Sequence, residues 1–162
     1  MTGAARNPSK SPVADWLGYS LQSGKTDGDG ESCAGAVHKL SFEDRHIGNP
    51  LIRAIHGGVV AAFFEYAAQQ AGLDAIAASS RGTGADVGND ADPYQIDTVS
   101  INIDYLASTK AADLFARTTV KKCGRRLVFI DVEGWQDTPA RPVATAQVCL
   151  RIATKEKGPE GP

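Results

Sequence analysis

The sequence predicts an α+β fold in which one long helix lies on one face of an antiparallel sheet. The segment 56–72, HGGVVAAFFEYAAQQAG, has the composition of a helix that is apolar on nearly every side, and a helix of this kind is buried by the rest of its fold. From residue 95 onward, apolar residues recur at every second position, which is typical of half-buried antiparallel strands. One strand, one buried helix and then a run of strands is the element order of a sheet covered by a helix.

Length, charge and cysteine content limit the classes of protein to which the chain can belong. Its 162 residues suffice for a single domain with a sound core. A net charge of -2 and a pI near 5.9 argue against a nucleic-acid partner. Cys33, Cys123 and Cys149 lack the spacing of metal ligands, so we expect reduced thiols, no metal site and no cofactor. Because the sequence has neither a signal-peptide pattern nor a long apolar run, we expect a cytoplasmic protein without a membrane partner.

The part of the chain before the long helix is predicted to hold one short helix and one strand. Residues 1–12 are polar and contain two prolines, so we expect them to lack fixed structure. Apolar residues with helical spacing predict a helix over 13–21. A turn-rich linker at 24–31 leads to a strand at 32–42, a polar turn and an extended segment at 46–50.

The part after the long helix is predicted to be a loop followed by consecutive strands. Residues 79–93 are rich in Gly, Asp, Asn and Ser, and we expect a mobile loop there. The strands are predicted at 95–105, 112–122, 127–136 and 143–153. A hairpin turn is predicted at 123–126, and the charged segment 155–162 should be a disordered tail. The single domain therefore extends over 13–154.

The strand that follows residue 95 has the clearest alternation in the chain. Its apolar set alternates with a polar set: Val99, Ile101, Ile103 and Tyr105 against Thr98, Ser100, Asn102 and Asp104. This period of two predicts a strand with one buried and one solvated face.

The start of the long helix has a composition that suggests chemistry. Gly57 and Gly58 occupy its first turn, where each glycine costs roughly 1 kcal/mol relative to alanine. They allow either the close approach of another backbone or the access of a ligand oxygen to free N–H groups. Glu65 lies two turns further along the apolar helix, where an ionised carboxylate is costly unless it is paired or functional.

These motifs resemble those of a known family. The resemblance is carried by HGGVVAAFFEYAA, VSINIDYL, GRRLVFIDVEGW and VATAQVCLRI, and it covers residues 32–153. The chain resembles the acyl-CoA thioesterases of the phenylacetate-pathway type, which have the hot-dog fold, a curved antiparallel sheet wrapped around one central helix. The resemblance implies hydrolysis of an acyl-CoA thioester to the free acid and coenzyme A. It also implies a homo-oligomer, a dimer or a tetramer, whose subunits pair their sheets edge to edge and share the site.

The resemblance assigns the principal catalytic roles to the helix. Glu65 matches the acid that acts as general base or nucleophile toward the thioester carbonyl. The backbone N–H groups of Gly57 and Gly58 match the donors that stabilise the oxyanion, and His56 matches a positioning residue. Each residue also has a structural interpretation: Glu65 in a buried ion pair, the glycines in close packing, and His56 as a helix cap.

Two further positions are assigned by the same resemblance. Thr98 matches a strand hydroxyl that lies near the attacking water in some members, although most strand threonines are structural. Related enzymes often have an asparagine six residues before the histidine of HGG, where this chain has Pro50. Asn49 is adjacent and is the candidate to replace that asparagine.

Substrate contacts are expected from one charged cluster and one aromatic cluster. Four cations share the predicted hairpin turn: Lys121, Lys122, Arg125 and Arg126. They could bind the phosphates of coenzyme A, or they could form a solvated turn. Phe63, Phe64 and Tyr66 could line an acyl pocket, or they could pack in the core.

Two other functions remain open from the sequence. The segment HIGNPLIRAIHGGVVAAFFE is also similar to hydroxyacyl-thioester dehydratases of the same fold, in which His46 and Glu65 would be the catalytic pair. The third possibility is an acyl-binding module without catalytic activity. Turnover of acyl-CoA, hydration of an enoyl thioester, or binding without turnover distinguishes the three.

Overall fold

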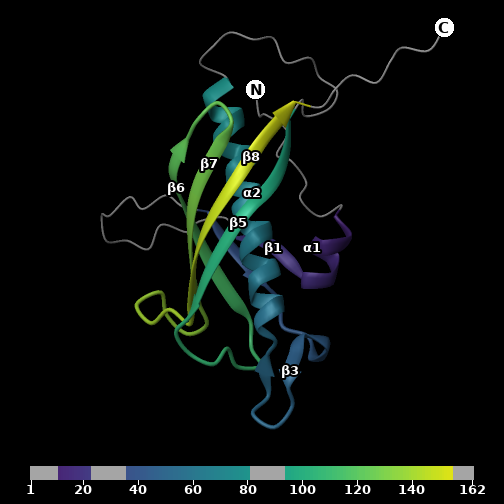
Figure 1. The fold of residues 1–162 in the computed structure, drawn as a ribbon. Helices are drawn as coiled ribbons and strands as arrows, with labels where there is room; N and C mark the ends of the chain where they lie inside the picture. Colours follow the sequence, from purple (N-terminus) through teal and green to yellow (C-terminus); the bar gives the residue numbers. More distant parts are fainter. Residues whose placement is uncertain (1–10, 23–35, 81–93, 155–162) are drawn as a thin grey trace, which may run out of the picture.

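A computed structural model describes residues 11–22, 36–80 and 94–154 of the chain. Figure 1 shows one long helix lying against a tall antiparallel sheet. The N-terminal elements are α1 (Pro12–Leu17), β1 (Tyr19–Gln22), β2 (Val37–Leu40), the 3-10 helix η2 (Asp44–His46), β3 (Ile47–Asn49) and β4 (Ala54–Ile55). They are followed by α2 (Gly57–Ser80), β5 (Tyr94–Tyr105), β6 (Leu114–Cys123), β7 (Leu127–Trp135) and β8 (Ala144–Thr154). Within the described ranges, no helix has the length and apolar character needed to cross a bilayer.

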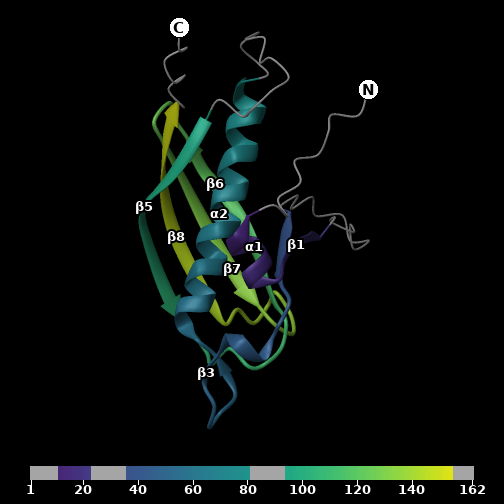
Figure 2. The ribbon, with the colours of Figure 1, turned by 90° about the vertical axis from the view of Figure 1, so that its right-hand side faces the viewer.

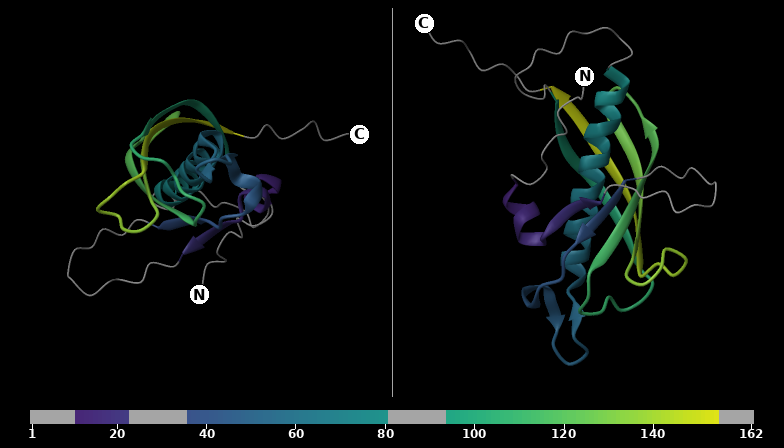
Figure 3. Two further views of the ribbon diagram at one scale, coloured as in Figure 1. Left: turned by 90° about the horizontal axis from the view of Figure 1, so that it is seen from below. Right: turned by 180° about the vertical axis from the view of Figure 1, so that it is seen from behind.

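Six strands form one antiparallel sheet in the order β1-β2-β6-β7-β8-β5, and β3 pairs with β4 in a separate hairpin. Seen along the helix, the sheet curves around α2 (Figure 3). The side view in Figure 2 shows α2 covering the concave face over most of its length. This arrangement confirms the predicted α+β class and the hot-dog architecture.

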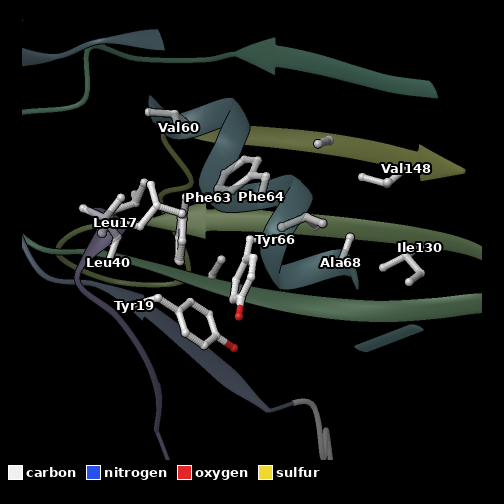
Figure 4. Close-up of a cluster of buried hydrophobic side chains, with 14 of the residues drawn as sticks. Leu17, Tyr19, Leu40, Val60, Phe63, Phe64, Tyr66, Ala68, Ile130 and Val148 are labelled. Carbon is white, nitrogen blue, oxygen red and sulfur yellow. The ribbon is translucent and has the colours of Figure 1, made fainter. Parts of the chain in front are cut away.

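The core lies between α2 and the concave face of the sheet, and Figure 4 shows its aromatic part. Phe63 and Phe64 are fully buried, and each contributes roughly 1.5–3 kcal/mol of hydrophobic stabilisation. The ring of Phe64 lies directly on Gly134 of β7, where any Cβ would overlap with it. The apolar alternation of β7 is confirmed, because Val128, Ile130 and Val132 all face the helix and are buried.

One face of α2 departs from the expectation of a fully buried helix. Four residues at helical spacing are only half-buried: Ala61, Ala62, Glu65 and Gln69. They lie toward β5, the strand at one edge of the sheet, as the hydrogen bond from Gln69 to Thr98 shows. The face that bears the predicted catalytic acid is therefore accessible in a single chain.

Strand β5 contains a bulge that changes which residues face the helix. Thr98 is paired with Leu150 and Ser100 with Cys149, so Val99 is the extra residue. From residue 100 to residue 104 the predicted alternation is confirmed. It is wrong at Val99 and Tyr105, which are 58% and 52% exposed although the pattern placed them on the buried face. It is also wrong before the bulge, where Thr98 faces the helix.

The N-terminal elements also differ from the expectation. The predicted helix over 13–21 ends at Leu17, because Gly18 adopts a left-handed conformation (φ 57°) and its N–H bonds to the Asp15 carbonyl. The chain then enters β1, a strand that the sequence did not predict. The strand predicted at 32–42 is confirmed over Val37–Leu40, and the long helix continues to Ser80. The expectations for residues 1–10, 24–31, 81–93 and 155–162 lie outside the described residues.

A polar cluster is buried between β1, β2 and β6. His38 is 1% exposed; its Nδ1 lies 2.7 Å from the Tyr19 hydroxyl and its Nε2 lies 3.2 Å from the Thr118 hydroxyl. Burial lowers the pKa of His38 to about 4 and raises the pKa of Tyr19 above its ordinary value. The imidazole is therefore held neutral in a site where all three groups have hydrogen-bond partners.

Candidate active site

The helix start is capped by the histidine that precedes it. The Gly58 N–H donates to His56 Nδ1 at 2.9 Å, and the His56 carbonyl accepts from Val59 and Val60 at 2.9 and 3.2 Å. His56 is thus the N-cap of α2, with its ring in the place where a serine or aspartate oxygen usually lies. Because the Gly58 N–H is already engaged, the prediction that both glycines offer free donors is wrong for Gly58 in this structure.

Gly57 retains a free N–H. Within the described part of the chain, no acceptor lies within hydrogen-bond distance of it. On its other side, the Tyr105 hydroxyl donates to the Gly57 carbonyl at 2.7 Å. A Cβ at position 57 would lie 3.3 Å from the Tyr105 ring, so the close approach of β5 and the accessible donor both favour glycine here.

His56 is positioned by the β3–β4 hairpin. Its N–H donates to the His46 carbonyl at 2.9 Å. Gly48 lies against its side chain, where a Cβ would come within 2.6 Å of the His56 Cβ and ring and 2.7 Å of its Cα. The pairing of β3 and β4 is irregular at Gly48, which brings the two backbones together. This contact was not evident from the sequence.

Glu65 is half-buried on the helix face directed toward β5. Its neighbours one turn toward the helix start are Ala61 and Ala62, which leave space above the carboxylate. Among the described residues, none forms a hydrogen bond or ion pair with Glu65. The structural interpretation requires a cation that pairs with the Glu65 carboxylate, and the described chain contains no such partner.

Thr98 lies beside the same helix face. Gln69, four residues after Glu65, donates from Nε2 to Thr98 Oγ1 at 3.2 Å. The bulge at Val99 makes this contact possible, because without it Thr98 would point to the opposite face. Gln69 and Tyr105 are the two residues of this region that sequence reasoning missed. Each contacts a partner at least 29 positions away, and no local pattern indicates such contacts.

Asn49 is not brought to Glu65. Its Oδ1 accepts from the Leu51 N–H at 3.0 Å, which forms a local turn at the exposed tip of the β3–β4 hairpin. The asparagine therefore stabilises the hairpin that supports His56, and its expected part in the site stays a prediction.

The predicted substrate-binding residues lie elsewhere in the single chain. The cations at 121–126 surround the β6–β7 hairpin, which lies at the opposite end of the sheet from the start of α2 (Figure 1). Lys121 is paired with Asp131 at 3.1 Å. Phe63 and Tyr66 are buried and their rings pack against Tyr19 in the core of the single chain; their expected contact with an acyl group stays a prediction.

His46 has a structural role. It is fully buried, its Nδ1 accepts from the Glu43 N–H at 3.1 Å, and its Nε2 donates to the Trp16 carbonyl at 3.1 Å. Because both ring nitrogens are engaged by backbone groups, this histidine is not available as the proton donor of a dehydratase.

A separate hollow lies on the other face of the sheet. It has a volume of about 520 Å³ and is lined by polar and charged side chains, among them Arg117, Lys121, Asp131 and Glu133. These side chains alternate with the buried residues of β6 and β7 and therefore point away from α2. In the described ranges, no cluster of three His, Cys, Asp or Glu side chains could hold a metal ion.

Known structures with the same fold come from several organisms. A thioesterase from Haemophilus influenzae is 16% identical, with a TM-score of 0.67 over 94% of this chain and 89% of the other. A thioesterase family protein from Silicibacter pomeroyi is 16% identical, with a TM-score of 0.65 over 89% and 90%. A phenylacetic acid degradation-related protein from Ralstonia eutropha is 19% identical, with a TM-score of 0.61 over 90% and 94%.

Comparison with curated protein sequences gives no significant match. The thioesterase superfamily model matches residues 53–143, more than half of the sequence. The matched segment contains the capped helix start, Glu65, Thr98 and Tyr105. The chain belongs to the thioesterase superfamily.

Proposed function

We propose that this protein hydrolyses acyl-CoA thioesters, with Glu65 as the general base and the Gly57 N–H as the oxyanion donor. The observation that carries the proposal is a half-buried carboxylate without a partner in the described chain, on the same helix as a free N–H at its positive end. Eight residues separate the two positions, about 12 Å along the helix axis. Helical side chains lean toward the N-terminus, so the carboxylate approaches the end where the donor lies.

The chemistry follows from the two groups. Glu65 removes a proton from water, and the oxygen of that water attacks the carbonyl carbon of the thioester. The Gly57 N–H stabilises the negative charge that develops on the carbonyl oxygen, assisted by the helix dipole. When the intermediate collapses, the carbon–sulfur bond breaks and Glu65 returns the proton to the departing sulfur. The products are the free acid and coenzyme A.

Thr98 and Gln69 support this assignment. Their hydrogen bond holds two polar side chains beside Glu65, where an attacking water needs a second hydrogen-bond partner in addition to the base. A phenylacetate-type acyl group fits the motif resemblance described above, and the Ralstonia eutropha protein of the same fold is a phenylacetic acid degradation-related protein.

We also propose that the site is completed by a second copy of the chain. Strand β5 is an edge strand with no neighbour on its outer side within the described residues. Val99, Tyr105 and Leu106 are exposed there, next to the face that bears Glu65. Pairing of two β5 edges would bury these side chains and cover the open site. Cys123 and Cys149 are free thiols, which is consistent with the proposed cytoplasmic location.

The test is Glu65→Gln, which keeps the volume of the side chain and removes its basic oxygen. We expect kcat for an acyl-CoA panel, followed with a thiol reagent, to fall by roughly 10²–10⁴ with KM nearly unchanged. Thermal stability should hold or rise, because a carboxylate without a partner among the described residues is replaced by a neutral amide. Glu133→Gln, the same change on the outer face of the sheet, is the matched control and should retain full activity. A folded Glu65→Gln protein with near-normal hydrolysis would refute the mechanism, and wild-type protein that binds acyl-CoA without turnover would indicate a binding module.

A further inference from the structure

We propose that Tyr105 is a positioning residue which, together with His56, fixes the backbone of Gly57 and so aims the oxyanion donor; this inference rests on the function proposed above. The peptide group between Gly57 and Gly58 is held at both ends. Its carbonyl accepts from the Tyr105 hydroxyl at 2.7 Å, and its N–H donates to His56 Nδ1 at 2.9 Å. We call these two side chains the peptide clamp.

The need for a clamp comes from the two glycines. A glycine pair has many accessible backbone conformations, so the first turn of α2 would be poorly defined without added restraints. In a planar trans peptide the N–H and the carbonyl point in opposite directions, so one hydrogen bond at each end opposes a flip of the whole group. The clamp thus replaces the rigidity that side chains would give at these positions.

The adjacent peptide group carries the donor itself. The carbonyl of His56 is held by the N–H groups of Val59 and Val60, so the N–H of Gly57, on the same peptide, points away from the helix. Gly57 connects this peptide to the clamped one. With both planes fixed, neither backbone angle of Gly57 is free, and the donor keeps one direction before substrate arrives. An oxyanion donor that is already oriented costs no reorganisation during the reaction.

The ring of Tyr105 contributes as well as its hydroxyl. A Cβ on Gly57 would lie 3.3 Å from the ring, at the limit of close contact. The ring therefore lies close against Gly57, and its partner His56 is fixed from the other side by Gly48 of the β3–β4 hairpin. Tyr105 is the last residue of β5, so the clamp joins the edge strand to the catalytic helix.

The experiment compares Tyr105→Phe, His56→Ala, the double variant and His56→Asn. Tyr105→Phe removes only the hydroxyl. Asparagine is a favoured N-cap whose side-chain oxygen can accept from the Gly58 N–H, so His56→Asn should restore what His56→Ala loses. Asp104→Asn changes the neighbouring residue on the other face of β5 and is the matched control.

Two readouts are measured on the full chain. The first is the exchange rate of the Gly58 amide hydrogen by NMR, which does not depend on activity. We expect it to rise in Tyr105→Phe and His56→Ala, and to stay at the wild-type rate in Asp104→Asn. The second is steady-state hydrolysis of acyl-CoA. We expect kcat to fall roughly 10- to 100-fold in Tyr105→Phe, with KM within about twofold and the melting temperature within about 2 °C, because the donor is misaligned while binding is kept.

The double variant is the sharpest comparison. Because both side chains hold one peptide, the loss of either frees it, and the double variant should be about as slow as the slower single variant. The inference is overturned if the Gly58 amide exchanges at the wild-type rate in Tyr105→Phe, or if exchange is faster there while kcat is unchanged. It is also overturned if the fold-loss of kcat in the double variant equals the product of the fold-losses in the two single variants. A wild-type protein without thioesterase activity would instead refute the proposed function, and the exchange rates would still decide whether the clamp exists.

Discussion

The buried His38 predicts a specific loss of stability in mild acid. In the folded protein the imidazole stays neutral down to about pH 4, whereas in the unfolded chain it takes up a proton near its ordinary pKa of 6.5. The unfolded state therefore binds more protons as the pH falls through this range, and protonation favours unfolding. The contribution of His38 to the free energy of unfolding is fully present above pH 6.5. It falls between pH 6.5 and pH 4 and does not change further below pH 4.

The magnitude follows from the two pKa values. A depression of about 2.5 units corresponds to about 3.4 kcal/mol once the pH is below both values. Between pH 7 and pH 5 the linkage relation gives about 1.8 kcal/mol from this one group. Hydrogen bonds from Lys39 and Arg151 lower the pKa values of Asp113 and Asp97. Because these pKa values are lowered from their ordinary range, the two carboxylates titrate at lower pH than His38 does in the unfolded chain and contribute little to the interval.

The assay is urea unfolding of wild type and His38→Gln at pH 7 and pH 5. The variant is expected to be less stable at pH 7 because it disrupts the contacts with Tyr19 and Thr118, but to lose about 1.8 kcal/mol less than wild type on acidification. His46 and His56 are present in both proteins, so their contributions cancel. An NMR titration of the His38 ring should place its pKa near 4. Equal pH dependence in the two proteins would refute the reasoning.

Two further predictions concern the hairpin behind His56 and the edge strand. Gly48→Ala places a Cβ within 2.6 Å of His56, so we expect the free energy of unfolding to fall by about 1–3 kcal/mol and hydrolysis to be slower. Gly124→Ala is the control: its Cβ would meet only the Leu127 carbonyl at 3.3 Å, so its free energy of unfolding should fall less. Equal unfolding free energies for the two variants would contradict this prediction. For the wild-type protein, light scattering should give a molecular mass of two or four times 17.0 kDa. The variant Leu106→Glu, at the β5 edge, should shift the protein toward an inactive monomer. A fully active wild-type monomer would exclude the shared site.

The sequence was sufficient to predict elements whose pattern is uniform over many residues. Strand β7 has its buried residues on one face from Val128 to Gly134, so its periodicity predicted a strand, and α2 is apolar over most of its length, so its composition predicted a helix. The predicted helix over 13–21 failed because its apolar spacing continues past Gly18, and only the left-handed conformation of that residue shows where the helix ends. The pattern counts apolar residues and does not detect a change of backbone direction.

The candidate site was predictable to the extent that it is local in the chain. Gly57 and Glu65 lie on one helix, and their spacing alone indicated a donor and an acid in proximity. The engagement of the Gly58 N–H depends on the orientation of the His56 ring, which Gly48 sets from another strand. Tyr105 and Gln69 act through partners distant in sequence, and such contacts are set by tertiary packing.

The bulge at Val99 makes the length of β5 as important as its composition. If the same residues paired without the bulge, the residues before Val99 would reverse direction. Ile96 and Thr98 would then point to solvent and Asp97 toward the helix, with a charged group in the core and no hydroxyl beside Gln69. Deletion of Val99 itself leaves Thr98 opposite Leu150 and Ser100 opposite Cys149, the pairing of a regular strand, so the direction of the other side chains should be retained. Insertion of a second residue beside Val99, if it is absorbed by the ladder, should instead reverse the residues before it, and substitution of the exposed Val99 should have little effect.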